Sequence, residues 1–408
     1  MRVPFIEAMA RFGAMSPISS TTSKESAPLM YPRFRKSNVD APTHAEQSGL
    51  IDRIIEAFRR GAEGFHRAMT DFGESPWSEN GWTGRQSRIM EALRSGDCGN
   101  LHGLLSKFFE SRDAYGLALG CDELEQVTAS EDRTNHYLTH WRESLEHLAL
   151  NLGVVRATNP EIEDAAVRSL KVFSDEALVL AIEKHTGSTL EFPPAMAPFG
   201  VTVCDLRLPV PTLALNHYMV AIWCRWLCKN NDDPIVELGP GYGGVGYFLA
   251  KQGHRRYTGF DLPFASAVQA YFLGTALGAD AIRLFGENPT NEARVHLLPS
   301  WTLLDRSLGN TELPSCNLFL SQDCLVEITP HLAGRYLNSI LAATRAWVLL
   351  IAPDRSGSSA DWIGTRSTEL LSAHPQFRRI ERSLYSMRPG YFRELYLREP
   401  PDNCHVPA

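Results

Sequence analysis

The sequence has no long apolar run. None of its hydrophobic stretches approaches the ~18 consecutive residues that a membrane-spanning helix needs. The first residues, MRVPFIEAMARFGAM, also lack the continuous apolar core that is typical of a signal peptide. We therefore expect a cytoplasmic protein that makes no contact with a membrane.

The sequence also lacks an excess of basic residues. Lys and Arg number 40 against 47 Asp and Glu, which gives a formal net charge of −7. A protein dedicated to nucleic acid would need a basic surface for the phosphates, so we expect no nucleic-acid partner. The 44% of hydrophobic residues are typical of a globular chain, and 408 residues are too many for one ordinary core. Two domains are expected.

The eight cysteines contain no paired CxxC motif. Cys224 and Cys228 are spaced to share one face of a probable helix, where two thiols could hold a metal. No pair of histidines accompanies them, so buried free thiols in a reducing compartment are the better interpretation. We expect no structural metal site.

Composition and periodicity divide the chain into five segments. Residues near the N-terminus are rich in Ser, Thr and Pro, whereas stretches such as LIDRIIEAFRRGAEGF repeat apolar residues at helical spacing. The helical part is expected to contribute substrate contacts, a lid or a dimer surface. The predicted segments are a disordered or extended leader (1–46), a helical domain (47–190), a connector and helix (191–232), an α/β domain (233–399) and a tail (400–408).

From Pro234 onward, short apolar runs alternate with helical stretches. The runs are IVELG, YTGFDL, VHLLP, NLFLSQD and WVLLIAP, and helical patterns such as FASAVQAYFLGTALG and DWIGTRSTELLSAH stand between or after them. This alternation predicts a doubly wound, Rossmann-like sheet with helices on both faces. FRRIERSLYSM and FRELYLRE flank a turn at RPGY, which predicts a terminal antiparallel hairpin.

The glycine-rich stretch IVELGPGYGGVGYFLAKQG raises the question of which ligand it holds. Gly239, Gly241 and Gly244 fit the G-x-G-x-x-G pattern, and Asp261 follows at the distance of an acid that binds ribose hydroxyls. Glu237 would repel a pyrophosphate but attract the ammonium group of a methionine moiety. The dense glycine run, and a final hairpin suited to a seven-stranded sheet with one antiparallel strand, also favour S-adenosylmethionine over NAD.

The motifs VELGPGYGG, GFDLP and QAYFL resemble those of class I S-adenosylmethionine-dependent methyltransferases. Within that class the chain is similar to the bacterial sugar O-methyltransferase family, from about Pro193 to Glu399, although Pro240 stands where many relatives carry glycine. The resemblance implies that S-adenosylmethionine is the cofactor. It assigns Glu237, Gly239, Gly241 and Gly243 to the methionine end, Asp261 to the ribose, Leu262, Ser300 and Trp301 to the adenine, and Gln322 to the sulfonium. Asp261 could instead cap the next helix, and Trp301 could be a packing residue.

Catalytic groups are expected beyond the carboxyl ends of the strands. The segment SQDCLVEITPH places Asp323 and Glu327 between the fourth strand and a helix that Thr329-Pro330 should begin. His331 follows in the first turn of that helix. These three residues are the candidate catalytic cluster, although Glu327 could instead cap the helix and His331 could be solvent-exposed. Asp323 and Glu327 could also hold Mg²⁺, which we do not expect to be needed.

Two further candidates lie outside this segment. His217 precedes the first strand and could overhang the cofactor, with burial at the domain junction as the alternative. The resemblance puts Gln269 near the substrate.

The sequence therefore predicts a methyltransferase that acts on a hydroxyl of a sugar or a glycosylated small molecule. The alternatives are a nicotinamide-dependent oxidoreductase that uses the same glycine loop, and a cofactor-binding partner protein without turnover. A homodimer is possible. The absence of an N/D-P-P-[YF] motif after the fourth strand weighs against methylation of nucleic-acid bases.

Overall fold

A computed structural model of the chain describes most of the sequence. The described residues are 32–37, 43–69, 87–118, 120–155, 173–203, 209–304, 315–354, 357–359, 362–364 and 366–400. The first 31 residues of the predicted leader and residues 401–408 of the predicted tail lie outside them.

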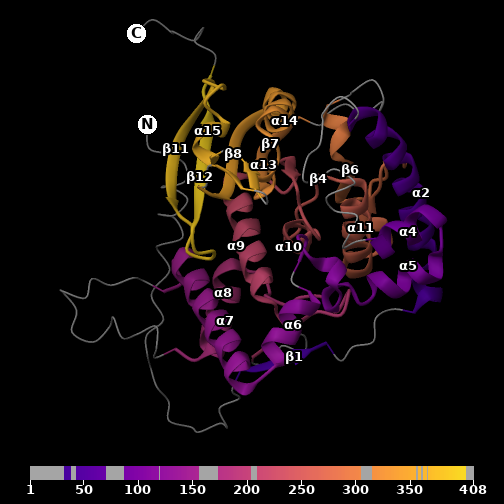
Figure 1. Cartoon of the computed structure of the whole chain (residues 1–408). Helices are drawn as coiled ribbons and strands as arrows, with labels where there is room; N and C mark the ends of the chain where they lie inside the picture. Colours follow the sequence, from indigo (N-terminus) through magenta and orange to yellow (C-terminus); the bar gives the residue numbers. More distant parts are fainter. Residues whose placement is uncertain are drawn as a thin grey trace, which may run out of the picture.

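The first half of the described chain is mostly helical, as predicted (Figure 1). Its helices are α2 (His44–Met69), α4 (Ser87–Ser95), α5 (Cys98–Leu105), α6 (Cys121–Thr128), α7 (Glu131–Asn151) and α8 (Asp175–Thr186), with 3₁₀ turns η1 (Phe108–Glu110) and η2 (Arg112–Ala114). Serine caps α7 and α8, because the side chains of Ser130 and Ser174 accept hydrogen bonds from first-turn N–H groups.

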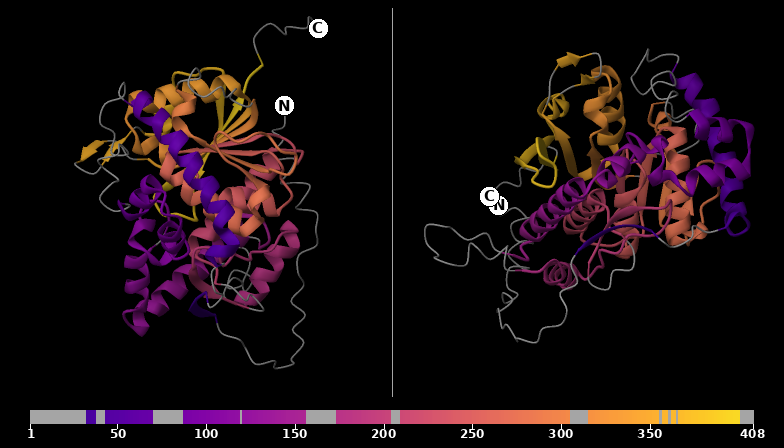
Figure 2. Two further views of the ribbon diagram at one scale, coloured as in Figure 1. Left: turned by 90° about the vertical axis from the view of Figure 1, so that its right-hand side faces the viewer. Right: turned by 60° about the horizontal axis from the view of Figure 1, so that its bottom comes forward.

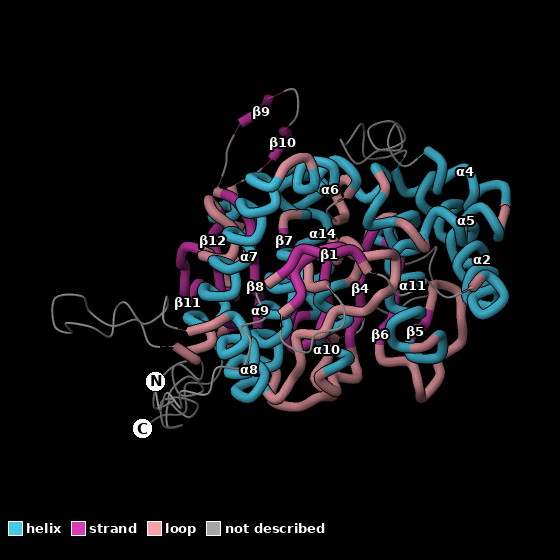
Figure 3. Tube along the Cα trace, turned by 90° about the horizontal axis from the view of Figure 1, so that it is seen from below, coloured by secondary structure: helices cyan, strands magenta, loops and turns pink. Residues whose placement is uncertain are grey.

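One short strand falls inside the predicted leader. Strand β1 (Arg33–Lys36) pairs antiparallel with β2 (Phe199–Thr202), a strand that the connector sequence suggested. The helix expected after the connector is α9 (Thr212–Leu227). Figure 3, a view from below, shows β1 crossing the underside of the molecule, and β1 also contacts α7.

The second half forms the expected Rossmann-like sheet. Its strands are β3 (Ile235–Leu238), β4 (Tyr257–Asp261), β5 (Ile282–Arg283), β6 (Val295–Pro299), β7 (Cys316–Gln322), β8 (Thr344–Pro353), β11 (Phe377–Leu384) and β12 (Tyr391–Arg398). Their order is β11-β12-β8-β7-β3-β4-β6-β5. Strand β12 runs opposite to the other seven strands, so its pairs with β8 and β11 are antiparallel. Seven strands match the prediction, and the two-residue strand β5 adds an eighth at the edge.

Helices cover both faces of this sheet. They are α10 (Gly244–Lys251), α11 (Pro263–Leu277), the one-turn helix α13 (Cys324–Glu327), α14 (Pro330–Ala343) and α15 (Ser367–Leu370), with 3₁₀ turns η4 (Ala279–Ala281) and η5 (Ser300–Leu303). Alternate strand residues point to opposite faces, so Leu349 and Ile351 join one buried cluster while Val348 and Leu350 join the other.

The sequence pattern failed after β8. The helix expected from DWIGTRSTELLSAH is instead a small hairpin, β9 (Gly357–Ser359) with β10 (Trp362–Gly364), and only the four-residue α15 follows. Figure 3 shows this hairpin standing away from the main sheet. Tertiary contact decides the position of α15, because its Ser367 hydroxyl donates to the fully buried Glu394 carboxylate at 2.6 Å.

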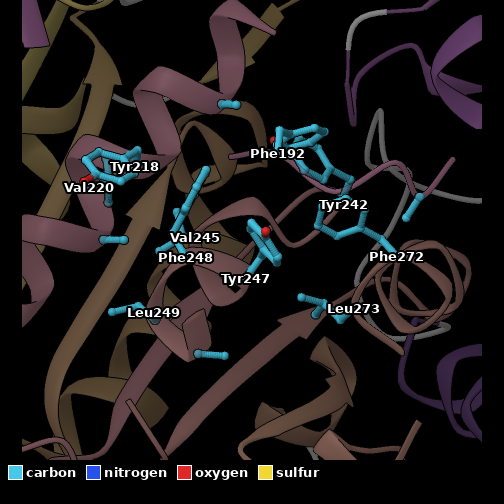
Figure 4. Packing of buried hydrophobic residues seen from close by; sticks show 14 of the residues in the cluster. Phe192, Tyr218, Val220, Tyr242, Val245, Tyr247, Phe248, Leu249, Phe272 and Leu273 are labelled. Atoms are coloured by element: carbon cyan, nitrogen blue, oxygen red, sulfur yellow. The ribbon is translucent and has the colours of Figure 1, made fainter. Parts of the chain in front are cut away.

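The helical half and one face of the sheet share a single buried cluster, which includes Ile54 and Phe58 of α2 and Phe272 of α11. Two views in Figure 2 show α2 lying along the side of the sheet domain, where it packs on α11. Close by the glycine loop, Figure 4 shows Tyr242 and Phe192 beside Phe272. The rings of Tyr242 and Phe272 meet edge to face at 5.0 Å. Among the described helices, none is long and apolar enough to cross a membrane.

Candidate active site

A cavity of about 360 Å³ lies at the carboxyl ends of β3, β4 and β7. From β3 the chain continues to β4 on one side of the sheet and later to β7 on the other, so this is the point where the strand order reverses. Ligands of open α/β sheets bind at such switch points. The cavity is lined by residues 116–118, Leu213, His217, 238–241, 260–262, Phe264, Ala265, Ser300, 322–324, Glu327, Ile328, Leu332, Tyr336 and Arg388.

The glycine loop forms one wall because its backbone takes conformations that favour glycine. Gly239, Gly241 and Gly243 have φ values of +77°, +61° and +97°. A Cβ atom at Gly239 would lie 2.4 Å from the Cβ of Cys324, so a side chain there would collide with the opposite wall. Gly239 and Gly241 line the cavity, whereas Gly243 caps α10 behind it.

Asp261 ends β4 at the cavity with its carboxylate held in place. Its Oδ1 accepts from the Leu262 N–H at 2.8 Å, and its Oδ2 accepts from the Gln269 Nε2 at 2.8 Å. Burial raises the pKa of Asp261 to about 7, against the lowering effect of the hydrogen bonds. A carboxylate can accept about four hydrogen bonds, so Asp261 keeps acceptor capacity at the cavity.

Gln269 does not line the cavity. Its side chain is fully buried and donates both to Asp261 and to the Gly241 carbonyl, the latter at 2.9 Å. The resemblance placed this residue near the substrate. The structure places it behind Asp261, where it joins the glycine loop to the Asp261 carboxylate.

Leu262 and Ser300 line the cavity as expected for adenine neighbours, but Trp301 does not. Its indole Nε1 donates to the Gly61 carbonyl of α2 at 2.8 Å, and its ring meets Phe285 edge to face. The indole is buried there because its N–H has a partner in α2, so Trp301 packs between the sheet domain and this helix.

Glu237 is 1% exposed and lies behind the cavity wall. Its carboxylate accepts from the Tyr257 hydroxyl at 2.5 Å and from the Gln322 Nε2 at 3.2 Å. Burial raises its pKa to about 7. Gln322 does line the cavity, and its Oε1 accepts from the Asn216 amide at 3.3 Å. Glu237 therefore acts on the cavity through the orientation of Gln322.

Asp323 and Glu327 both line the cavity, on a one-turn helix rather than in the expected loop. Asp323 caps this helix with φ +61° and ψ −47°, a conformation that costs a non-glycine residue about 1–3 kcal/mol and that is common at functional sites. Its Oδ2 lies 2.5 Å from the Arg388 Nη1, whereas its buried Oδ1 has no hydrogen-bond partner in the described residues. Burial and the neighbouring Asp323 raise the pKa of Glu327 to about 7.

The two histidine candidates differ in their position relative to the cavity. His331 is exposed in the first turn of α14, behind the Thr329 cap that the sequence predicted, and does not line the cavity. His217 does line it, with Nδ1 2.9 Å from the Tyr242 hydroxyl. Burial, with the positive charge of Arg388, lowers the pKa of His217 to about 3. A neutral imidazole of such low basicity can donate or accept a hydrogen bond, but it is a weak base that does not readily take up a proton.

Sequence reasoning missed two parts of the cavity. Residues Gly116–Ala118 come from the helical half, and the Leu117 carbonyl lies 3.2 Å from where a Cβ on Gly241 would stand. Arg388 comes from the turn of the final hairpin. No signal marks either segment, because a short loop between helices and an arginine in a turn are both typical of a protein surface.

Comparisons with known proteins do not assign the chain to a family. No family model matches the sequence, and no curated protein matches it. Solved structures of similar fold include magnesium protoporphyrin IX methyltransferase from Synechocystis PCC 6803 with bound SAH, at 10% identity over 46% of this chain and 84% of that one, TM-score 0.34. A 1,6-didemethyltoxoflavin-N1-methyltransferase from Burkholderia thailandensis, bound to its acceptor and S-adenosylhomocysteine, matches at 20% identity over 45% and 79%, TM-score 0.31. The glycopeptide N-methyltransferase MtfA complexed with sinefungin matches at 12% identity over 45% and 94%, TM-score 0.32. Similarity of this degree carries no argument about activity, so the class of fold rests on the strand order itself.

Proposed function

We propose that the protein is an S-adenosylmethionine-dependent O-methyltransferase that acts on a hydroxyl of a saccharide or a glycosylated small molecule. One observation carries the proposal. The glycine loop and Asp261, which suit an adenosine cofactor, share a single cavity with Asp323, and one oxygen of its carboxylate has no partner in the part of the chain that the structure describes.

The geometry suits the cofactor in three ways. Backbone at Gly239 and Gly241 allows the methionine part to approach closely. Asp261 offers two carboxylate oxygens to the ribose hydroxyls. Gln322, oriented by Glu237, presents a polar side chain at the end of β7. The antiparallel strand β12 also differs from the all-parallel sheet of a dinucleotide-binding domain.

The reaction needs a hydroxyl held in line with the sulfonium methyl group. The acceptor oxygen forms a bond to the methyl carbon, the carbon–sulfur bond breaks with its electron pair left on sulfur, and the hydroxyl proton must leave. Asp323 Oδ1, which has no hydrogen-bond partner among the described residues, would accept the hydrogen bond of that hydroxyl and take its proton as the methyl group is transferred. Placement of the hydroxyl supplies most of the rate, and a positioned base typically adds about 10²–10⁴-fold. Glu327 and His217 provide further polar contacts for an acceptor rich in hydroxyls.

Calorimetric titration with S-adenosylhomocysteine tests the cofactor assignment. We expect micromolar binding that is lost in Asp261→Ala, and no binding of NAD in a parallel titration. Transfer of labelled methyl from S-adenosylmethionine to a mixed panel of methyl glycosides then tests the acceptor. Binding of NAD alone would overturn the proposal. Cofactor binding without transfer, unchanged by loss of Asp323, would favour a non-catalytic partner protein.

A further inference from the structure

Arg388 is the only Lys or Arg among the described residues that line the cavity. Its guanidinium is fully engaged on two sides. Nη1 donates to Asp323 Oδ2 at 2.5 Å, and Nη2 donates to the Tyr391 hydroxyl at 2.6 Å. The guanidinium carbon also lies 3.8 Å from the centre of the Tyr391 ring. The arginine is therefore fixed between the carboxylate and the ring.

The turn that carries Arg388 is itself anchored at both sides. Within it, the Arg388 N–H donates to the Tyr385 carbonyl at 3.1 Å, and the Tyr385 N–H donates to the Tyr391 carbonyl at 2.8 Å. The Tyr385 hydroxyl donates to Asn216 of α9. The Asn151 amide of α7 donates to the Ser386 hydroxyl at 2.7 Å. Two helices, α7 and α9, therefore hold the turn in place.

The turn and the backbone around Asp323 together determine the direction in which its carboxylate faces the cavity. Its backbone N–H donates to the Ile351 carbonyl at 3.0 Å, which fixes the residue in its unusual positive-φ conformation. The ion pair then fixes the side chain through Oδ2 and leaves Oδ1 as the oxygen that has no hydrogen-bond partner among the described residues. A carboxylate held through one oxygen presents the other in a defined direction to an incoming hydroxyl.

We propose that Arg388 is a positioning residue for methyl transfer: its ion pair orients Asp323 and balances the charge of that carboxylate, so that Oδ1 receives the acceptor hydroxyl. This inference rests on the proposed function. It gives the hairpin turn a role in the reaction, although this turn lies far along the chain from the glycine loop. The guanidinium also supplies the positive charge that a metal ion would otherwise have to bring.

Other charged or titratable groups surround Asp323, and they share the pH dependence. Glu327 repels it, which is one reason why the pKa of Glu327 is raised. The positive charge of Arg388 opposes this rise, so loss of the guanidinium would let Glu327 hold its proton to higher pH. The groups that interact with Asp323 are Cys324 and Glu327 from α13 and Tyr385, Arg388 and Tyr391 from the hairpin. His217 from α9 and Asp261 from β4 line the same cavity.

The test compares Arg388→Gln, Arg388→Lys and a matched variant on the same hairpin, Arg378→Gln, whose partner Glu399 is exposed. With labelled cofactor and the methyl glycoside panel as acceptors, we expect kcat to fall about 100-fold in R388Q, with partial recovery in R388K and no change in R378Q. The acid limb of the kcat profile should move up by about one pH unit in R388Q. Affinity for S-adenosylhomocysteine should stay within a factor of three.

Asp323→Asn separates positioning from general damage. If Arg388 acts through Asp323, the double variant D323N/R388Q is no slower than D323N alone. Additive losses would overturn the proposal, and so would an unchanged kcat and pH profile in R388Q. Parallel losses of cofactor affinity and thermal stability in R388Q would show a structural role only. If the wild-type protein fails to bind S-adenosylhomocysteine, the proposed function fails instead. The ion pair can still be measured then, as non-additive shifts in the unfolding midpoint of the same variants.

Discussion

Gly64 of α2 offers the sharpest test of how the helical half supports the cavity. A Cβ atom there would lie 2.1 Å from Cζ2 of Trp301, far inside contact distance. Gly64→Ala therefore has to displace the indole and weaken its 2.8 Å hydrogen bond to the Gly61 carbonyl. Because the indole is 1% exposed and packed against Phe285, it has little room to move.

The magnitude follows from three opposing effects. Overpacking of a core position costs about 1–3 kcal/mol. A buried indole N–H left without a partner costs about 1–3 kcal/mol more if the hydrogen bond breaks entirely. Alanine in place of glycine inside a helix returns about 1 kcal/mol. We expect Gly64→Ala to lower the free energy of unfolding by about 2 kcal/mol, measured by urea denaturation.

Gly49→Ala is the matched control on the same helix. A Cβ at Gly49 would meet no atom within 4 Å, so only the helix propensity acts and stability should rise by about 0.5–1 kcal/mol. Ser300, the neighbour of Trp301, lines the cavity. We therefore expect G64A, but not G49A, to weaken binding of S-adenosylhomocysteine several-fold. Equal stabilities of the two variants would refute the reasoning.

Two predictions concern carboxylates whose pKa burial raises to about 7. For Glu237, the folded state binds more protons than the unfolded state between about pH 5 and pH 7, so the free energy of unfolding should fall as pH rises through this range. Glu237→Gln should flatten that dependence, as measured by denaturant unfolding at pH 5.5 and pH 8. For Glu327, the sulfonium of S-adenosylmethionine favours the charged carboxylate, so binding should release a proton, whereas binding of the neutral-sulfur product should not. Calorimetry in two buffers of different ionisation enthalpy measures this difference, which Glu327→Gln should abolish.

Each of these predictions has a contradicting outcome. A pH profile of stability that is the same in wild type and E237Q would mean that other groups dominate, and the buried carboxylate would then be ionised at little cost. Equal proton release on binding the two cofactor forms would place the sulfonium away from Glu327. A difference that persists in E327Q would assign the proton to another group.

The sequence predicts those parts of the site that depend on local chain geometry. Glycines at 239 and 241 mark a turn that needs positive φ, and Asp261 and Asp323 are found because parallel strands end at the same edge of the sheet. Thr329 is recognisable as a helix cap because its partner, the Leu332 N–H, is three residues away. These signals are complete within a few residues.

The remainder depends on partners that periodicity does not reveal. Trp301 follows a strand, where the resemblance implies an adenine contact, but its hydrogen-bond partner is 240 residues away in α2. Arg388 stands in an ordinary turn motif, and only the sheet order brings it over Asp323. Gln269 has the right neighbourhood but an unexpected partner, because the direction of a side chain on a helix is set by packing. The β9–β10 hairpin stands where the sequence pattern predicted the start of a helix.

The cavity is lined by Leu117 from the helical half and by Arg388 from near the end of the chain. During synthesis, the glycine loop and its strands emerge long before the hairpin that completes the site. Residues up to β8 can leave the ribosome before the hairpin turn has been made, so Asp323 has no ion-pair partner until Arg388 is present. The last hairpin therefore completes a side of the cavity that the earlier strands do not supply.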